Sequence, residues 1–183
     1  MTSGAPRATL ALLGLRASGK STLGRLLATE LGQPFVDLDE EVTRFARHAG
    51  QRAASAGELL ARCGQATFRH LEAGALRCLL EPSPRIVLAT GGGVVERADN
   101  RAWLARAARC LFLDAPVELL AERVRRDRTP RPALLGSDAA AELVELEARR
   151  RERYQALATW VLDCGADSPT DLLARALALV RSG

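Results

Sequence analysis

A short glycine-rich stretch near the amino end limits what this chain can fold into. Residues Gly14 to Ser21 read GLRASGKS, and Thr22 follows them. This is the G-x-x-x-x-G-K-[ST] spacing, in which glycines let successive backbone N–H groups curl around a phosphate. An apolar run at 9–13 precedes the stretch, and leucines at helical spacing follow it. The order of strand, loop and helix places the positive end of a helix dipole at the same phosphate.

The residue types in this loop indicate a site for a nucleoside triphosphate. Lys20 is the single lysine among 26 Lys and Arg residues, and a compact ammonium on a flexible stem suits the β- and γ-phosphates. Ser21 is placed to offer its hydroxyl to a Mg²⁺ that bridges those phosphates. We therefore expect ATP and Mg²⁺ as cofactors. The predicted nucleotide-binding residues belong to the loop and the first helical turn: Gly14, Ala17, Ser18, Gly19, Lys20, Ser21 and Thr22.

The bulk composition suits one soluble domain that spans 1–183, since 48% of its 183 residues are apolar and 26% are charged. No apolar run approaches the roughly 20 residues that span a bilayer, so we expect a cytoplasmic protein without membrane contact. The net charge is +4, but arginines are interspersed with acidic residues and aromatics make up only 4%. This pattern favours small anionic ligands over nucleic acid. We also expect a monomer.

The four cysteines, Cys63, Cys78, Cys110 and Cys164, are widely spaced, with no C-x-x-C pair and no histidine at ligand spacing. Neither a zinc site nor a disulfide framework is indicated. We expect buried thiols.

Five short apolar runs, separated by stretches of helical periodicity, predict an α/β fold. The runs lie at 9–13, 35–39, 85–89, 110–114 and 160–163. Leucine and alanine spacing predicts helices between them, with a break at Gly64 and a last helix that opens at Ser168 and Pro169. The alternation predicts a three-layer fold with a five-stranded parallel sheet between helices, and a ligand site at the carboxyl ends of the strands.

Two carboxylates follow the second predicted strand. Asp37 and Asp39 are two residues apart, so on a strand from 35 to 39 they face one space. We expect that space to be the ligand crevice. The alternative is that both side chains cap the helix that begins near Glu40.

The stretch Gly91-Gly92-Gly93 follows the strand at 85–89. Three consecutive glycines cost entropy unless the backbone approaches a ligand closely, whereas a plain flexible turn is the alternative. Upstream, Arg69 and Glu72 lie three residues apart on a predicted helix. The alternative to a functional role for this pair is an ordinary surface ion pair.

Arginines dominate two later segments. Those at 125, 126, 128 and 131 lie beside prolines between two helices, which predicts a lid over 125–137 that closes over the nucleotide. A solvated charge run is the alternative. Arg150 lies in the middle of the apolar stripe of the helix predicted at 138–159. A buried guanidinium needs an anionic partner, which is either a structural carboxylate or a substrate.

Together these motifs resemble the shikimate kinase family, within the nucleoside-monophosphate-kinase-like group of P-loop folds. The family's elements occur in order over nearly the whole chain: Gly14 to Thr22, Asp37-x-Asp39, Phe68-Arg69 with Glu72, Gly91 to Gly93, Arg131-Pro132, and Arg150 four residues before Tyr154. The resemblance implies transfer of the γ-phosphate of ATP to the 3-hydroxyl of shikimate.

For the substrate side, the resemblance implies that Arg69 and Arg150 hold the carboxylate of shikimate, with Glu72 steadying Arg69. Asp39 would bind the ring hydroxyls and orient or deprotonate the acceptor. The glycines of 91–93 would line the substrate through backbone N–H groups. The substrate-binding segment would cover about 38–80.

For the nucleotide side, the resemblance implies that Asp37 and Ser21 hold Mg²⁺ and that Lys20 acts on the transferring phosphate. Arg131 would move over that phosphate. One of Arg125, Arg126 and Arg128 would face the adenine, and Arg128 is named as the nucleotide-binding candidate among them. The chain departs from the family pattern in the lid, with Arg131-Pro132-Ala133-Leu134 where Arg-Pro-Leu-Leu is usual, and in a longer segment between Asp39 and Arg69.

Two other functions stay open at this point. A kinase of another small hydroxy acid or of a nucleotide would share the fold and the phosphate loop. A catalytically silent ligand-sensing module, of the kind found in transcription regulators, would share the fold too. We expect no room for the DNA-binding domain of such a regulator before the first strand.

Overall fold

A computed structural model describes residues 9–126, 139–165 and 167–182, and it contains the expected parallel sheet. The strands are β1 (Thr9–Leu13), β2 (Phe35–Asp37), β3 (Val87–Ala89), β4 (Ala108–Asp114) and β5 (Trp160–Asp163). Their order in the sheet is β2-β3-β1-β4-β5, and every neighbouring pair is parallel. The predicted α/β class and the five-stranded parallel sheet are therefore confirmed.

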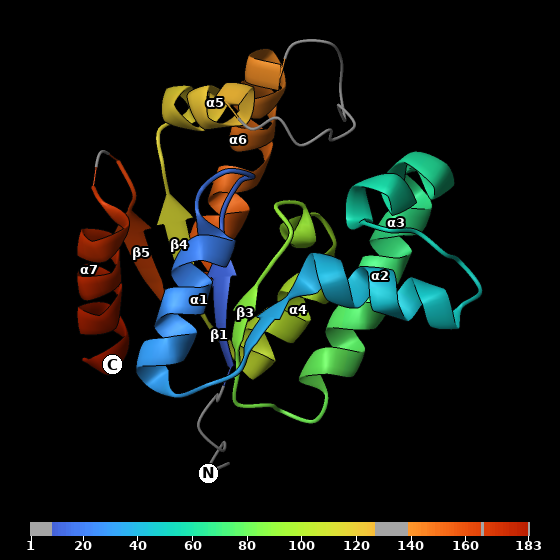
Figure 1. Cartoon of the computed structure of the whole chain (residues 1–183), viewed down its shortest axis with the longest axis horizontal. Coiled ribbons are helices and arrows are strands. Elements are labelled where there is room, and N and C mark those ends of the chain that lie inside the picture. Colours follow the sequence, from blue (N-terminus) through green and yellow to red (C-terminus); the bar gives the residue numbers. More distant parts are fainter. Residues whose placement is uncertain (1–8, 127–138, 166, 183) are drawn as a thin grey trace.

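Helices cover both faces of the sheet, and some of them lie beyond it (Figure 1). They are α1 (Lys20–Leu31), α2 (Leu38–His48), α3 (Ala56–Leu80), α4 (Ala98–Ala107), α5 (Val117–Arg126), α6 (Ala139–Leu157) and α7 (Pro169–Arg181), with a 3₁₀ turn η1 (Val94–Glu96) after β3. Helices α1 and α7 pack together on one face, and α4 and α6 pack together on the other. In the described part of the chain, no helix combines the length and the apolarity that crossing a membrane requires.

Local residue chemistry sets several helix ends. Gly32 ends α1 in a left-handed conformation with φ 61°, which a residue without a Cβ adopts at low cost. Ser168 caps α7 by accepting a hydrogen bond from the Asp171 N–H at 3.2 Å. The predicted break at Gly64 is confirmed, because that residue has φ 76° and ψ 164° inside α3.

The second strand is shorter than the sequence predicts. It ends at Asp37, and Asp39 lies in the first turn of α2, so the expectation that both carboxylates share one strand face is wrong. The physical reason is a helix cap: the Asp37 side chain accepts a hydrogen bond from the Asp39 N–H at 3.0 Å, which starts the helix at once. Capping, the alternative interpretation, applies to Asp37.

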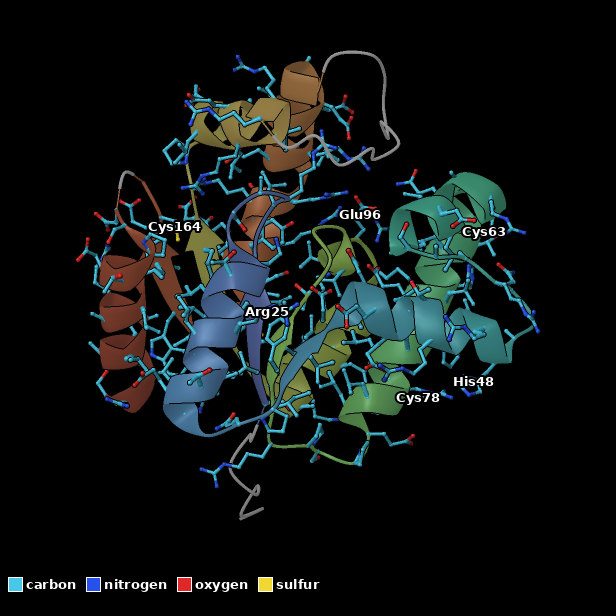
Figure 2. The ribbon with its side chains drawn as sticks, viewed as in Figure 1. Arg25, His48, Cys63, Cys78, Glu96 and Cys164 are labelled. Carbon is cyan, nitrogen blue, oxygen red and sulfur yellow. The ribbon has the colours of Figure 1, made fainter. Side chains whose placement is uncertain are left out.

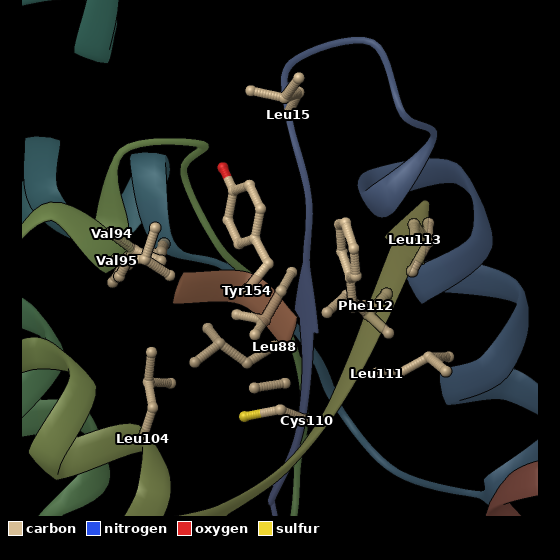
Figure 3. Packing of buried hydrophobic residues seen from close by; sticks show 14 of the residues in the cluster. Leu15, Leu88, Val94, Val95, Leu104, Cys110, Leu111, Phe112, Leu113 and Tyr154 are labelled. Atoms are coloured by element: carbon tan, nitrogen blue, oxygen red, sulfur yellow. The ribbon is translucent and has the colours of Figure 1, made fainter. Parts of the chain in front are cut away.

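The core lies on both faces of the central strands, and β4 supplies a large part of it (Figure 3). The rings of Phe112 on β4 and Tyr154 on α6 stack with their centroids 5.1 Å apart. This contact joins the sheet to α6 and brings the hydroxyl end of Tyr154 towards the carboxyl ends of the strands.

None of the four cysteines, all of which lie in the described residues, takes part in a disulfide bond. Cys110 and Cys164 are buried, whereas Cys63 is half-buried and Cys78 is exposed. The expectation of buried thiols is therefore wrong for Cys78, which lies on α3 between the core residues Leu76 and Leu80 and on the other side of the helix.

Candidate active site

The stretch from Gly14 to Gly19 forms a tight loop between β1 and α1. Gly14 has φ 144°, and a Cβ atom added there would lie 2.8 Å from Ser18 Oγ and 2.9 Å from the Leu113 carbonyl oxygen. Gly19 has φ 93° and occupies the N-cap position of α1. Both glycines are required by the backbone, and the loop leads directly into the amino end of a helix, where anions bind.

Lys20 is folded back over this loop instead of extending into solvent. The residue is buried, with 8% of its surface exposed. The ammonium donates hydrogen bonds to the carbonyl oxygens of Gly14 at 2.9 Å and Leu15 at 2.6 Å, and to Ser18 Oγ at 3.2 Å. The positive charge is thereby held at the mouth of the loop.

Ser21, in the first turn of α1, contacts Asp37 at the end of β2. The Ser21 hydroxyl donates a hydrogen bond to Asp37 Oδ2 at 2.9 Å, and both side chains face solvent beside the loop. Thr22 is exposed next to Ser21. A hydroxyl and a carboxylate are hard oxygen donors, so the pair fits a Mg²⁺ that draws its other ligands from water and phosphate. Within the described ranges, no group of three or more His, Cys, Asp or Glu side chains is arranged to hold a metal without such help.

A second cluster lies one strand away, where α3 meets the glycine stretch. Arg69 Nη1 donates a hydrogen bond to Glu72 Oε1 at 2.8 Å. A Cβ atom added at Gly93 would lie 1.9 Å from Arg69 Nη2, and one added at Gly91 would lie 2.9 Å from Asp39 Oδ1. The consecutive glycines therefore make room for the charged side chains packed against them, and the plain flexible turn is not needed to explain them.

Arg150 enters the same cluster from α6. Its side chain is 3% exposed, and its Nε donates a hydrogen bond to Glu96 Oε1 at 2.9 Å. The other oxygen of that carboxylate, Glu96 Oε2, lies 3.6 Å from Arg69 Nε. Of the two partners that the sequence left open for Arg150, the structure supplies a carboxylate of the protein itself.

The two glutamates of the cluster differ in their electrostatics. Burial raises the pKa of Glu72 to about 7, and the charges of Asp39 and Glu96 add to this while Arg69 opposes it. Burial also acts to raise the pKa of Glu96, but the hydrogen bond and charge of Arg150 and the charge of Arg69 outweigh it, so that this pKa lies below its ordinary value. Glu96 is thus the firmly ionised member of the pair.

Tyr154 links α6 to the glycine stretch, because its hydroxyl donates a hydrogen bond to the Gly92 carbonyl oxygen. Burial raises the pKa of Tyr154 well above its ordinary value, so the hydroxyl stays protonated and able to donate. The four-residue spacing of Arg150 and Tyr154 places both on one side of α6.

The lid is only partly within the described residues. Arg125 and Arg126 end α5 and are exposed, and Arg126 pairs with Glu122 at 2.5 Å. Arg128 and Arg131, and most of the predicted lid at 125–137, lie outside the described residues. A contact that the sequence did not predict comes from the same helix: Arg123 Nη1 donates a hydrogen bond to the Ala17 carbonyl oxygen at 3.2 Å.

Sequence reasoning also missed Glu96. It follows two buried valines in a single 3₁₀ turn, where no helical or strand period marks which side it faces. Its partner Arg150 is 54 positions away in the chain. The only local signal was that a charged residue directly follows the two buried valines after the glycine stretch.

The phosphate loop and the arginine cluster open onto the same edge of a parallel sheet, one strand apart, and this arrangement defines the class as that of the P-loop kinases. The model of the Shikimate kinase family matches residues 16–181, which is most of the chain. The chain belongs to that family.

Known relatives agree with this placement. A shikimate kinase of Oleidesulfovibrio alaskensis is 43% identical over 156 residues, covering 83% of this chain and 86% of that protein. A shikimate kinase from Acinetobacter baumannii, solved in complex with shikimate, matches with a TM-score of 0.84 and 31% identity over 97% of this chain and 94% of that one. A gluconokinase from Sinorhizobium meliloti, at 16% identity and a TM-score of 0.53, shares the fold alone.

Proposed function

We propose that the protein transfers the γ-phosphate of ATP to the 3-hydroxyl of shikimate. The observation that carries the proposal is the position of Gly92 between the two halves of the site. A Cβ atom added there would lie 3.4 Å from the Arg16 backbone nitrogen, 3.5 Å from the Gly14 carbonyl oxygen and 3.6 Å from Arg150 Nη1. One glycine therefore separates the phosphate loop from the guanidinium that we assign to the acceptor.

On the nucleotide side, the backbone N–H groups of the loop and the ammonium of Lys20 bind the phosphates of ATP. Transfer of a phosphoryl group passes through a loose transition state, so positioning and charge stabilisation matter more than a strong base. Ser21 and Asp37 would hold a Mg²⁺, directly or through water. The ion would neutralise part of the negative charge of the phosphates.

On the acceptor side, Arg69 and Arg150 bind the carboxylate of shikimate, and the hydrogen bond from Arg69 to Glu72 fixes the first of these guanidinium groups. Asp39 binds the ring hydroxyls and orients or deprotonates the 3-hydroxyl. A position for Asp39 beside the substrate is supported by its packing against Gly91. The backbone of 91–93 lines the ring.

The lid roles rest on the resemblance alone. Arg131 moves over the transferring phosphate and Arg128 contacts the nucleotide. We also propose that 1–183 acts as one domain, as a monomer and in the cytoplasm, without nucleic-acid or membrane partners.

An assay of ADP release tests the proposal against its alternatives. The acceptors are shikimate, quinate, gluconate and nucleoside monophosphates, each with ATP and Mg²⁺. We expect turnover with shikimate, and we expect Lys20→Ala to abolish it while the thermal unfolding midpoint stays within a few degrees. Turnover with a nucleotide or gluconate only would refute the shikimate assignment, and binding of shikimate without turnover would support the ligand-sensing module.

A further inference from the structure

Glu96 uses both of its carboxylate oxygens on the arginine pair. Oε1 accepts hydrogen bonds from the Nε and Nη2 edge of Arg150, and Oε2 lies 3.6 Å from Arg69 Nε. One carboxylate of the protein thus spans both guanidinium groups. This is the arrangement that the proposed function gives to the carboxylate of the substrate.

We propose that Glu96 is a specificity-determining residue: its carboxylate occupies the arginine pair in the free protein, and the carboxylate of the acceptor must displace it to bind. The inference rests on the proposed function, which assigns Arg69 and Arg150 to the acceptor. Glu96 then lowers the affinity for acids in general and admits those that gain further contacts with the ring.

The charges of the cluster favour displacement over sharing. The carboxyl group of Glu72 already contacts the guanidinium of Arg69, and that of Glu96 contacts the guanidinium groups of both Arg69 and Arg150. Another carboxylate added beside Glu96 would increase the negative charge in a site that is largely closed to water. Like charges in such surroundings repel strongly, so the two anions compete for the same donors.

Glu96 is also the carboxylate of the cluster whose side chain is able to turn away from the arginine pair. Its side chain is 14% exposed, whereas that of Glu72 is fully buried at 0%. Val94 and Val95 of the same turn are buried and anchor the backbone, so the side chain turns outward without moving the glycine stretch. Figure 2 shows Glu96 at the carboxyl ends of the strands, which is also the end of the sheet at which the phosphate loop lies.

Steady-state kinetics with Glu96→Gln test the inference, with Asp99→Asn as the matched control. Asp99 is exposed and pairs with Arg97, so its replacement removes one nearby negative charge without touching the arginine pair. We expect the KM for shikimate to fall roughly tenfold in Glu96→Gln. This factor corresponds to one charge-assisted hydrogen bond between Glu96 and the arginine pair, which shikimate no longer has to break when it binds. We expect no such change in Asp99→Asn. An unchanged or higher KM in a folded Glu96→Gln overturns the inference.

A second readout separates competition from a merely structural role. In Glu96→Gln, the preference for shikimate over its uncharged carboxamide should rise about tenfold, because only the acid competes with Glu96. In a crystal of the unmodified protein with ADP and shikimate, Glu96 should be turned away from Arg150. An intact pair of Glu96 and Arg150 beside a bound acid overturns the inference, whether or not the variant folds.

Failure of the proposed function would look different. If the unmodified protein does not phosphorylate shikimate, the acceptor assignment is wrong, and calorimetry with benzoate then decides the role of Glu96 alone. Tighter benzoate binding by Glu96→Gln than by the unmodified protein supports competition for the arginine pair, and equal binding overturns it.

Discussion

Replacing Glu72 by glutamine should make the folded protein more stable above pH 7 and alter how its stability depends on pH. Burial raises the pKa of this carboxyl from its ordinary value of 4.5 to about 7. Between these pH values the folded state keeps a proton that the unfolded chain has released, so stability falls as the pH rises. At 1.36 kcal/mol per pH unit the loss reaches about 3 kcal/mol by pH 8, with the attraction of Arg69 already included.

Glutamine has the shape of the protonated glutamate and does not titrate. The variant should therefore match the unmodified protein near pH 4.5 and exceed its free energy of unfolding by about 3 kcal/mol at pH 8. Urea denaturation at several pH values between 4.5 and 8 measures the difference, in which the other titrating groups cancel. Glu81→Gln, at an exposed position after the same helix, controls for the loss of one carboxyl. A difference for Glu72→Gln that is constant over this range would refute the reasoning.

Three further substitutions probe the two halves of the site. Gly93→Ala places a Cβ atom 1.9 Å from Arg69 Nη2, which displaces the guanidinium from Glu72 and should raise the KM for shikimate roughly tenfold or more; an unchanged KM would mean that this guanidinium does not bind the acceptor. Gly14→Ala forces a side chain onto φ 144° and into the loop, so ATP affinity by calorimetry should drop, and unchanged affinity contradicts the loop geometry. Asp37→Asn should raise the Mg²⁺ concentration that gives half-maximal activity, which a Mg²⁺ titration at saturating ATP tests.

The sheet and the phosphate loop could be predicted because their signals are local. The runs at 9–13 and 160–163 are strands with those bounds in the structure. A short apolar run bounded by turn residues is typical of a buried strand. The loop from Gly14 to Ser21 combines fixed spacing with a preceding strand and a following helix. Each of these features is decided within about ten residues of chain.

The arginine cluster could be predicted only in part, because its partners come from distant elements. The position of Arg150 on the apolar face of α6 showed that it needs an anion, but the anion, Glu96, lies on η1 and is reached only through the packing of η1 against α6. Asp39 was misplaced for a smaller reason: the side chain of Asp37 caps the next helix two residues earlier than the alternation suggested. Neither the contact between Glu96 and Arg150 nor the early start of α2 can be predicted from the periodicity of the neighbouring residues.

Transfer of the labelled γ-phosphate of ATP to shikimate in a single turnover tests the central claim most directly. With enzyme in excess over ATP, the account predicts that the label appears on the 3-hydroxyl of shikimate with the unmodified protein, and that none is transferred by Lys20→Ala. Label that appears only as inorganic phosphate, or on a nucleotide in place of the acid, would contradict a site built from the phosphate loop and the arginine cluster around Gly92.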